Sequence, residues 1–468
     1  MKRTWVVCTV GVVMACGKSS SPPPSSASES GSGSSSGSAE VTKAAPAPED
    51  ATYLTLKSGA LVAIYGGKIQ LVTDKRAGRP IPRKGGGLWI WVDGAVSRFD
   101  GSLSPIPGTP NGVEPRASGP DGTMWAADRG KLATYDGTKW TEHDLATIGL
   151  GANVLVVDYA FAPDGTGYVR GDKAIGIYKA GAWSVVAAPG RVDSIGLVGT
   201  TLYAVVGTAL VKLDGDKLVE LAKLEKFPPK LAAGPGAAYL LSSGGGKRVE
   251  GDRLVGVKLP YLSSIAFGPD GALYGIPLEG KRIVRQKPDG TVDRLPSTDL
   301  AFQAKQVVVD GRGRLWVVLE YGFALVDGDK VTLVTPGTVP EVSSNVERLV
   351  TTGKGGDLPD VGAAKLINLK GKMVAGGTPK AGVKLELCPG ASSVFYGASP
   401  CAGKGFVRRA TSAADGAFEI TDVPLGGWHL IYQKSKDSWV FYWPDKCCGG
   451  LPKGGTFDMG DVEFGRSN

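Results

Sequence analysis

Few side chains in this 468-residue sequence could carry out nucleophilic or metal chemistry. Histidine occurs at only two positions, His143 and His429, and neither lies beside a serine or cysteine in a recognisable nucleophile motif. Two histidines also cannot build a three-histidine metal centre. We therefore expect structural or surface roles for both histidines, no catalytic residue, no metal site and no cofactor. On this basis the chain is predicted not to be an enzyme.

The N-terminus has the pattern of an export signal. Lys2 and Arg3 precede an apolar stretch that ends at Ala15, which is shorter than the roughly 20 residues that a membrane-spanning helix needs. Residues 1–15 are therefore predicted to be a signal peptide. Residues 16–50 begin with a cysteine and continue almost entirely in Ser, Pro, Gly and Ala, a composition that cannot bury enough apolar surface to fold. We interpret them as a disordered tether.

The end of this signal resembles the lipobox of bacterial lipoproteins, in the residues Val13-Met14-Ala15-Cys16. The resemblance implies export, cleavage before Cys16 and attachment to the membrane through acyl chains on that cysteine. No Asp follows Cys16, so nothing favours retention at the inner membrane, and the outer membrane is the expected location. The alternative is an ordinary signal peptide with an incidental cysteine.

Four further cysteines lie near the C-terminus: Cys388, Cys401, Cys447 and Cys448. An even number in an exported domain favours disulfides. We favour a bond from Cys388 to Cys401 across a short loop, which leaves Cys447 and Cys448 as a vicinal pair; crossed bonds between the two pairs are the alternative. A zinc site of four thiolates is a further interpretation, but the spacings do not form two Cys-x-x-Cys knuckles.

A dense aromatic run extends from Ser438 to Pro444. If this run is a strand, Trp439, Phe441 and Trp443 lie on one face. An exposed face of this kind would suit stacking on sugar rings or anchoring a protein partner. The alternative is that one face forms a domain core and the other packs against the remaining domain or the cysteine loop.

An aromatic residue recurs at a period of roughly 35–43 residues through the first two thirds of the chain, followed each time by short strands and a tight turn. The aligned positions are Tyr53, Trp89, Trp125, Tyr168, Tyr203, Tyr239, Tyr274 and Trp316. Asp-Gly pairs such as Asp214-Gly215 and Asp327-Gly328 predict two-residue hairpins of type I′. The pattern predicts an all-β fold, a β-propeller over residues 51–353 with about eight blades, seven being possible. Val346–Thr351 is predicted to close the ring by joining the first blade.

The repeat, with Gly-x-Leu-Trp followed by Tyr-Asp-Gly, resembles the propellers of periplasmic two-component regulators. The stretch from Ile265 to Leu295 is similar to the propellers of streptogramin lyases and NHL proteins. The resemblance implies the fold much more firmly than a function. A streptogramin lyase would need a catalytic histidine in the later blades, and no histidine lies between His143 and His429.

The pattern changes after a Gly/Asp-rich linker at residues 354–364, in which Asp357 and Asp360 are expected to be solvated. Residues 365–468 alternate short strands with turns such as Asp415-Gly416, which predicts a small β-sandwich. The order of strands, including a closing strand from Thr456 to Phe464, resembles the carboxypeptidase-regulatory-like family. That resemblance implies a non-catalytic accessory domain.

The charge distribution bears on the partner. The net charge is +8, but the basic residues are scattered rather than gathered into a stripe, so nucleic acid is not expected. The predicted function is a non-catalytic binding scaffold for a protein or glycan in the cell envelope, held at the membrane through its N-terminal lipid and monomeric. The alternatives are a propeller hydrolase or lyase of the lactonase type, and a purely structural envelope component.

Overall fold

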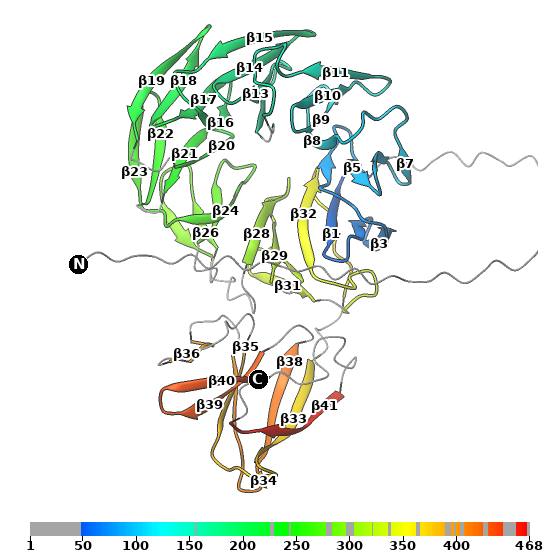
Figure 1. Cartoon of the computed structure of the whole chain (residues 1–468), viewed down its shortest axis with the longest axis vertical. Coiled ribbons are helices and arrows are strands. Elements are labelled where there is room, and N and C mark those ends of the chain that lie inside the picture. The colour runs from blue at the N-terminus through cyan, green and yellow to red at the C-terminus, as the bar shows by residue number, and fades with distance from the viewer. Residues whose placement is uncertain are drawn as a thin grey trace, which may run out of the picture. The chain divides into compact units, whose positions relative to one another are not determined.

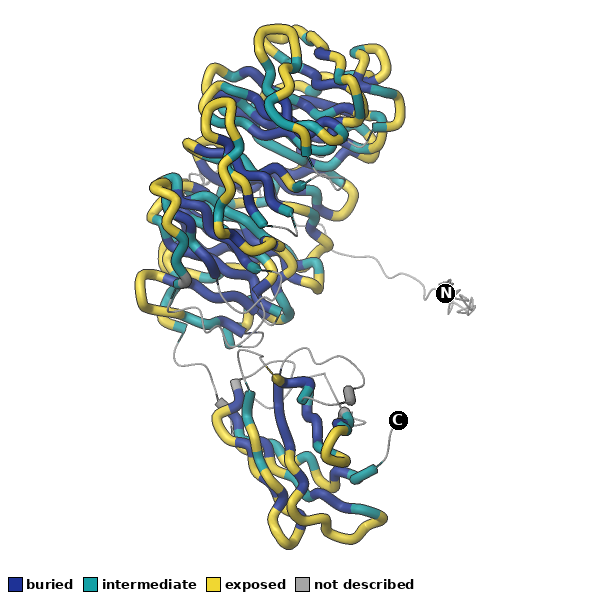
Figure 2. Tube along the Cα trace, turned by 90° about the vertical axis from the view of Figure 1, so that its left-hand side faces the viewer, coloured by how far each residue is buried: buried dark blue, intermediate teal, exposed yellow. Residues whose placement is uncertain are grey.

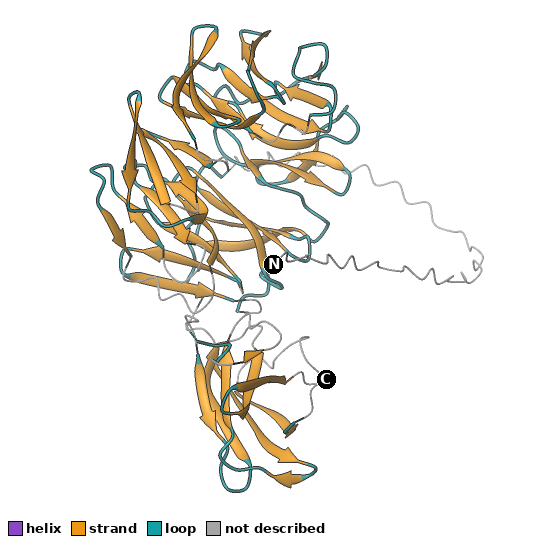
Figure 3. Cartoon of the chain, turned by 60° about the vertical axis from the view of Figure 1, so that its left-hand side comes forward, coloured by secondary structure: helices purple, strands orange, loops and turns teal. Residues whose placement is uncertain are grey.

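The computed structural model describes residues 48–154, 156, 158–224, 229–242, 245–277, 283–295, 304–320, 322–335, 338–361, 366–388, 395–396, 399–402, 407–424, 429–442 and 455–465. Strands and turns account for the regular structure of these residues, and none of them forms a helix (Figure 3). Within these ranges there is accordingly no helix of the length and apolarity that crossing a membrane requires. The prediction of an all-β chain is confirmed.

Eight four-stranded antiparallel sheets, here called blades 1 to 8, follow one another around a ring in the described residues (Figure 1). Their strands are given from the inner edge outward. Blade 1 contains β32 (Val346–Thr352), β1 (Ala51–Leu56), β2 (Leu61–Tyr65) and β3 (Lys68–Thr73). Blade 2 contains β4 (Ile81–Pro82), β5 (Leu88–Val92), β6 (Ala95–Phe99) and β7 (Leu103–Pro105), and blade 3 contains β8 (Glu114–Ser118), β9 (Met124–Asp128), β10 (Lys131–Tyr135) and β11 (Trp140–Asp144).

The next three blades have the same order. Blade 4 contains β12 (Tyr159–Phe161), β13 (Gly167–Arg170), β14 (Ala174–Lys179) and β15 (Ala182–Ala187). Blade 5 contains β16 (Val192–Val198), β17 (Thr201–Val206), β18 (Ala209–Asp214) and β19 (Lys217–Lys223). Blade 6 contains β20 (Lys230–Gly234), β21 (Ala237–Ser242), β22 (Gly245–Glu250) and β23 (Arg253–Val257).

The last two blades complete the ring. Blade 7 contains β24 (Leu262–Phe267), β25 (Leu273–Pro277), β26 (Val284–Gln286) and β27 (Val292–Arg294). Blade 8 contains β28 (Ala304–Val309), β29 (Leu315–Leu319), β30 (Phe323–Asp327) and β31 (Lys330–Val334). The count of eight, rather than seven, is therefore observed in the described residues.

The recurring aromatic residue occupies the second strand of every blade and packs against the adjacent blade, as predicted. Tyr53 and Trp316 have no exposed surface, and Tyr239 is 1% exposed. A separate hydrophobic cluster lies at each of the eight junctions between blades, for example Trp316 with Leu54 where blade 8 meets blade 1. The buried segments are mainly the second and third strands of the blades, whereas the turns are mostly exposed (Figure 2). Burial between sheets therefore holds the ring together.

The ring closes through β32, which pairs antiparallel with β1 although the two strands come from opposite ends of the propeller sequence. Leu349 lies opposite Leu54 in this pairing and has no exposed surface. Figure 1 shows β32 beside β1. The predicted closing strand is confirmed, and it supplies the inner strand that blade 1 otherwise lacks.

A buried ion pair ties blade 8 to the segment that follows β32. Asp310, which is 2% exposed, accepts hydrogen bonds from Arg314 Nε at 2.8 Å and Trp316 Nε1 at 3.0 Å. The Arg314 guanidinium also donates to the carbonyls of Lys354 at 3.1 Å and Gly356 at 2.8 Å. We call Asp310, Arg314 and these two carbonyls the closing clasp.

Asp357 is exposed to solvent, as predicted, and it is also paired with two arginines. Its carboxylate is half-exposed, but it accepts a hydrogen bond from Arg314 Nη1 at 3.2 Å and pairs with Arg312. The hydrogen bond from Arg312 is the main cause that lowers the pKa of Asp357. The linker thus begins as an ordered extension of the clasp.

The tight turns differ in part from the predicted type I′ geometry. Asp214 pairs with Lys217 and Asp327 with Lys330, so each Asp is the last strand residue and the turn consists of Gly followed by Asp. Only the glycine then has positive φ, as in a type II′ turn. The prediction was wrong at these turns because the pairing register, not the dipeptide, selects the turn residues.

The C-terminal described residues form two further sheets, and the predicted sandwich is observed. The first holds β34 (Thr378–Pro379), β33 (Leu366–Ala375) and β38 (Ala417–Pro424), with β41 (Gly455–Glu463) parallel to β33. The second holds β36 (Phe395–Tyr396), β40 (Ser438–Tyr442), β39 (His429–Ser435), β35 (Lys384–Cys388) and β37 (Arg408–Thr411). Apolar side chains of both sheets, including Met373, Leu385 and Tyr432, form one core.

Candidate functional site

The inner strands of the ring carry a polar residue at one equivalent position in every blade. On the second strand of each blade, the residue two places after the recurring aromatic pairs with a residue of the inner strand. That inner-strand residue is the equivalent position. In blade 1, for example, Arg348 pairs with Thr55, which follows Tyr53 by two places. We call these eight residues the polar level: Arg348, Arg79, Glu114, Asp158, Ser194, Lys230, Ser264 and Gln306.

Arg79 belongs to this level although it precedes the short strand β4. Ile81 pairs with Trp89, and Ala77 bridges to Val92, so Arg79 lies opposite Trp91. Asp158 likewise precedes the inner strand of its blade, β12. Its carbonyl accepts the backbone N–H of Arg170 at 3.2 Å, which places Asp158 opposite Arg170, two residues after Tyr168.

β-bulges accompany this level in five blades. The register of the inner strand shifts at Glu347, Arg116, Asp193, Ser263 and Lys305. A bulge leaves one residue without a partner in the ladder and re-aims its side chain. Each of these five residues is polar or charged and at least partly exposed. The inner edge of the ring therefore presents two adjacent sets of polar side chains.

Some members of the polar level bind the inner strand of the next blade. Gln306 donates from Nε2 to the carbonyl of Leu349 at 2.9 Å and accepts the Leu349 N–H at 3.0 Å. Ser264 Oγ accepts the N–H of Val307 at 3.1 Å. In blades 7 and 8 the side chains at this level thus reach the following blade and help to hold the ring together.

Both acidic members of the level are paired. Asp158 forms an ion pair with Arg170 at 2.9 Å, and Glu114 lies 3.3 Å from Arg116 Nη2. Burial raises the pKa of Asp158, while Arg170 and Lys230 act in the opposite direction. Lys230 belongs to blade 6, so charges of non-adjacent blades interact across the inner side of the ring.

Three arginines of the inner edge lie in consecutive blades 1 to 3: Arg348 and Arg79 of the polar level, and the bulge residue Arg116. The Arg79 guanidinium interacts electrostatically with those of Arg348 and Arg116, and burial together with these like charges lowers its pKa. In the described part of the chain no carboxylate lies within ion-pair distance of Arg79 or Arg348. Charge on the inner side of the ring is therefore uneven.

His143 lies away from this level, at the junction of blades 3 and 4. The Trp183 indole N–H donates to His143 Nδ1 at 3.2 Å, so the ring proton resides on Nε2, which contacts Thr134 Oγ1 at 3.0 Å. Tyr178 also packs against the imidazole. Both nitrogens have partners, which agrees with the predicted structural role of this histidine.

We predict that His143 makes the propeller sensitive to acid. Burial lowers the pKa of His143, so the unfolded chain takes up a proton at a higher pH than the folded chain does. The stabilisation is complete above the unfolded-state value near 6.5 and decreases as the pH falls below it. Between pH 7.5 and 5 the wild type should lose more unfolding free energy than His143→Gln, which can keep both hydrogen bonds. Equal losses in urea titrations of the two proteins would contradict this.

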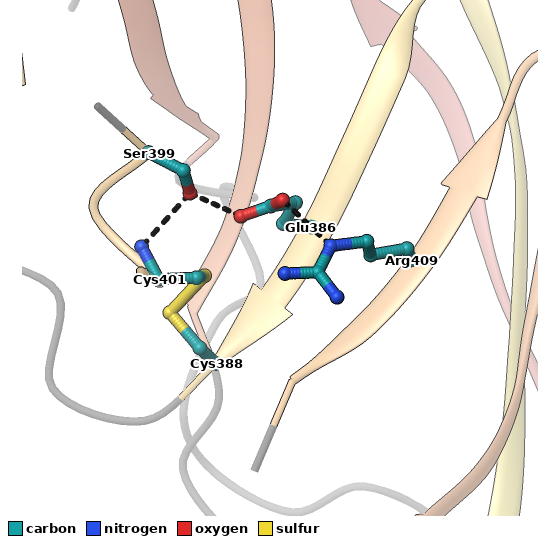
Figure 4. The surroundings of a disulfide bond; sticks show 5 residues. All are labelled: Glu386, Cys388, Ser399, Cys401 and Arg409. Atoms are coloured by element: carbon teal, nitrogen blue, oxygen red, sulfur yellow. Dashed lines mark hydrogen bonds and ion pairs between the residues drawn. A yellow bond between two sulfur atoms is a disulfide. The ribbon is translucent and has the colours of Figure 1, made fainter. Parts of the chain in front are cut away.

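The favoured disulfide is present between Cys388 and Cys401. Figure 4 shows Glu386 beside it, with its carboxylate held by the Ser399 hydroxyl and by Arg409 Nε, the latter at 2.9 Å. Ser399 Oγ also accepts the N–H of Cys401 at 3.0 Å. Cys16, Cys447 and Cys448 lie outside the described residues.

Removal of this disulfide should destabilise the C-terminal sandwich. The bond closes a loop with a sequence separation of 13, for which loop-closure entropy gives about 3 kcal/mol. We expect Cys388→Ala/Cys401→Ala to lower the unfolding free energy of the sandwich by roughly that amount, measured by denaturant-dependent hydrogen exchange of its strands. Unchanged exchange in the sandwich would contradict the prediction, and propeller exchange provides the internal control.

The aromatic run is corrected at Trp439. This side chain is only 8% exposed and packs with Cys388, Cys401 and Ile431. It is therefore unavailable for stacking on a ligand, and the alternative, that this face packs on the cysteine loop, holds at this position. The side chain of Phe441 and the whole of Trp443 lie outside the described residues. His429 is partly buried in β39, opposite Cys388.

Among the residues that the structure describes, no three His, Cys, Asp or Glu side chains gather closely enough to hold a metal ion. An open hollow of about 530 Å³ lies in the C-terminal sandwich, where Lys370, Phe418 and Asp458 contribute to its lining. Lys370 and Asp458 form an exposed ion pair there at 3.6 Å, so this hollow is weakly defined as a site.

No protein-family model matches the chain, and no curated protein matches its sequence. Solved structures of similar fold include virginiamycin B lyase from Staphylococcus aureus, at 16% identity over 60% of this chain and 98% of that one, with a TM-score of 0.40. PorZ, a surface component of the type-IX secretion system of Porphyromonas gingivalis, is 13% identical over 85% of this chain and 74% of its own, with a TM-score of 0.36. The WD40 propeller domain of Doa1 is 12% identical over 57% and 89%, with a TM-score of 0.33.

These propellers thus include both a lyase and a bacterial surface component. At such low identities and scores the likeness carries no argument about function. The fold assignment rests on the sheet order and ring closure described above: the chain contains an eight-bladed all-β propeller followed by a small β-sandwich.

Proposed function

We propose that the chain is an exported lipoprotein, anchored through Cys16, that binds a protein or glycan partner in the cell envelope without catalysis. The observation that carries the proposal is the polar level. Eight blades each place a polar residue at one equivalent inner position, whereas the surrounding junctions are filled by apolar side chains. Such a rigid ring of varied polar groups provides hydrogen-bonding and charge complementarity for a partner.

The non-catalytic part of the proposal draws support from His143. Its two ring nitrogens are engaged by Trp183 and Thr134, so the base most suited to proton transfer near neutral pH is committed to packing. The C-terminal sandwich, whose sequence resembles the carboxypeptidase-regulatory-like family, is proposed as an accessory module in the same assembly.

Capture from envelope extracts tests binding. The full chain would be compared with Asp158→Asn/Lys230→Gln, altered at the polar level, and with a control, Asp214→Asn/Lys217→Gln, altered at an exposed turn of blade 5. We expect the same protein or glycan to be enriched by the wild type and the control, and depleted with the polar-level variant. Equal enrichment by all three proteins, or none across several extracts, would refute this use of the ring.

Membrane anchoring has its own test. Cys16→Ala should move the protein from the membrane fraction to the soluble exported fraction, because the acyl chains would have no attachment point. Retention of the variant in the membrane fraction would contradict lipid anchoring and leave the binding proposal to be judged by the capture experiment.

A further inference from the structure

Three arginines lie at the inner edge of consecutive blades. Arg348 and Arg79 occupy the polar level in blades 1 and 2, and Arg116 is the bulged residue of the inner strand of blade 3. The inner strands that carry them are neighbours, with β4 in contact with both β32 and β8. The guanidinium of Arg79 interacts electrostatically with those of Arg348 and Arg116, the arginines on either side of it.

The positive charge of this cluster is poorly balanced by the protein. Arg116 is fixed by Glu114 at 3.3 Å and by the carbonyl of Ala127, to which its Nε donates at 3.4 Å. Arg79 and Arg348 have no comparable partner in the described ranges. Like charges in proximity disfavour one another, so the cluster is a standing source of repulsion that a bound anion would relieve.

The surroundings of Arg79 strengthen its attraction for an anion. Arg79 remains accessible to solvent, yet burial by the neighbouring strands is the largest cause that lowers its pKa, followed by the charge of Arg348. A cation that is partly desolvated but still reachable interacts more strongly with an incoming anion than a fully hydrated one does. The position of Arg79 between two other guanidinium groups makes it the centre of the cluster.

We infer that Arg79, Arg116 and Arg348 form a binding site for an anionic group of the partner, a carboxylate or a phosphate. The planar guanidinium fork donates two parallel hydrogen bonds to either group, which suits Arg better than Lys for this purpose. The inference rests on the proposed function, since it names the chemistry by which the ring would recognise its partner. An acidic glycan or a phosphorylated envelope component carries such a group.

Calorimetric titration of the full chain with two probes tests the site. Inorganic phosphate and D-glucuronate, each added at constant ionic strength against chloride, represent the two sources of the anion. We expect at least one probe to bind the wild type, and Arg79→Gln to weaken that binding about tenfold or more, as loss of a hydrogen bond to a charged group does. Arg253→Gln, on the exposed outer strand of blade 6, carries the same charge change and should bind like the wild type.

The outcomes distinguish a phosphate from a carboxylate, and they distinguish failure of the anion site from failure of the proposed function. Preference for phosphate or for glucuronate identifies the group, and thermal unfolding of Arg79→Gln at the wild-type temperature excludes a folding defect as the cause. Absence of binding by both probes, or equal binding by Arg79→Gln and the wild type, overturns the inference. If, in that case, Arg79→Gln and the wild type capture the envelope partner equally, the proposed function stands and only the anion site fails.

Discussion

Truncation of Leu349 to alanine should open the propeller at its seam. Leu349 has no exposed surface and packs with Leu54 and Trp316 where blades 1 and 8 meet. Removing a fully buried leucine side chain costs about 2–5 kcal/mol, because apolar contacts are lost and a cavity remains. The effect falls on the strand whose pairing with β1 converts an open array into a ring. Loss of that pairing would expose an edge strand that favours aggregation.

Urea unfolding followed by tryptophan fluorescence measures the change, with light scattering to detect aggregation. Glu347→Ala is the matched control, because Glu347 lies on the same strand but is exposed; its effect should stay within about 0.5 kcal/mol. If Leu349→Ala is as stable as Glu347→Ala, the closing strand does not determine the stability of the ring.

Replacement of Asp310 by asparagine should weaken the closing clasp by a similar amount. The buried carboxylate of Asp310 neutralises Arg314, whose side chain is 8% exposed, and also accepts the indole N–H of Trp316. Removing one partner of a buried ion pair typically costs about 3–5 kcal/mol, since the other charge loses its buried counter-charge; here only the half-exposed Asp357, 3.2 Å from Arg314 Nη1, would remain. Asp327→Asn, at an exposed turn of the same blade, should change stability by less than about 0.5 kcal/mol.

A second substitution distinguishes the ion pair from simple packing. Arg314→Met in the Asp310→Asn background removes the charge that has lost its buried partner, so it should restore part of the lost unfolding free energy. An additive loss in the double variant, measured by the same urea titration, would show that Asp310 and Arg314 do not act as a pair.

The ring itself could be predicted because its determinants are local and repeated. The aromatic positions from Tyr53 to Trp316 mark the second strand of every blade, and the unpaired strand near Leu349 predicts closure. Both predictions follow from the alternation of apolar residues and turns along a strand, which needs no knowledge of distant contacts.

The polar level has only a weak signature in the sequence. From blade 2 onward a polar residue precedes each recurring aromatic by roughly nine to eleven positions, as Arg79 precedes Trp89 and Gln306 precedes Trp316. The spacing varies because bulges and turn lengths differ between blades. Periodicity alone therefore could not show that these residues are equivalent.

What the sequence alone determined is the set of elements: short strands, recurring aromatics and a strand able to close the ring. The tertiary structure decided which side chains meet. Pairing register moved the turn at Asp214 by one residue, packing on the disulfide buried Trp439, and closure placed the strand of Arg348 next to the inner strand of blade 2. These outcomes depend on contacts between residues far apart in the chain, and the residue types that make such contacts carry no local signal of their partners.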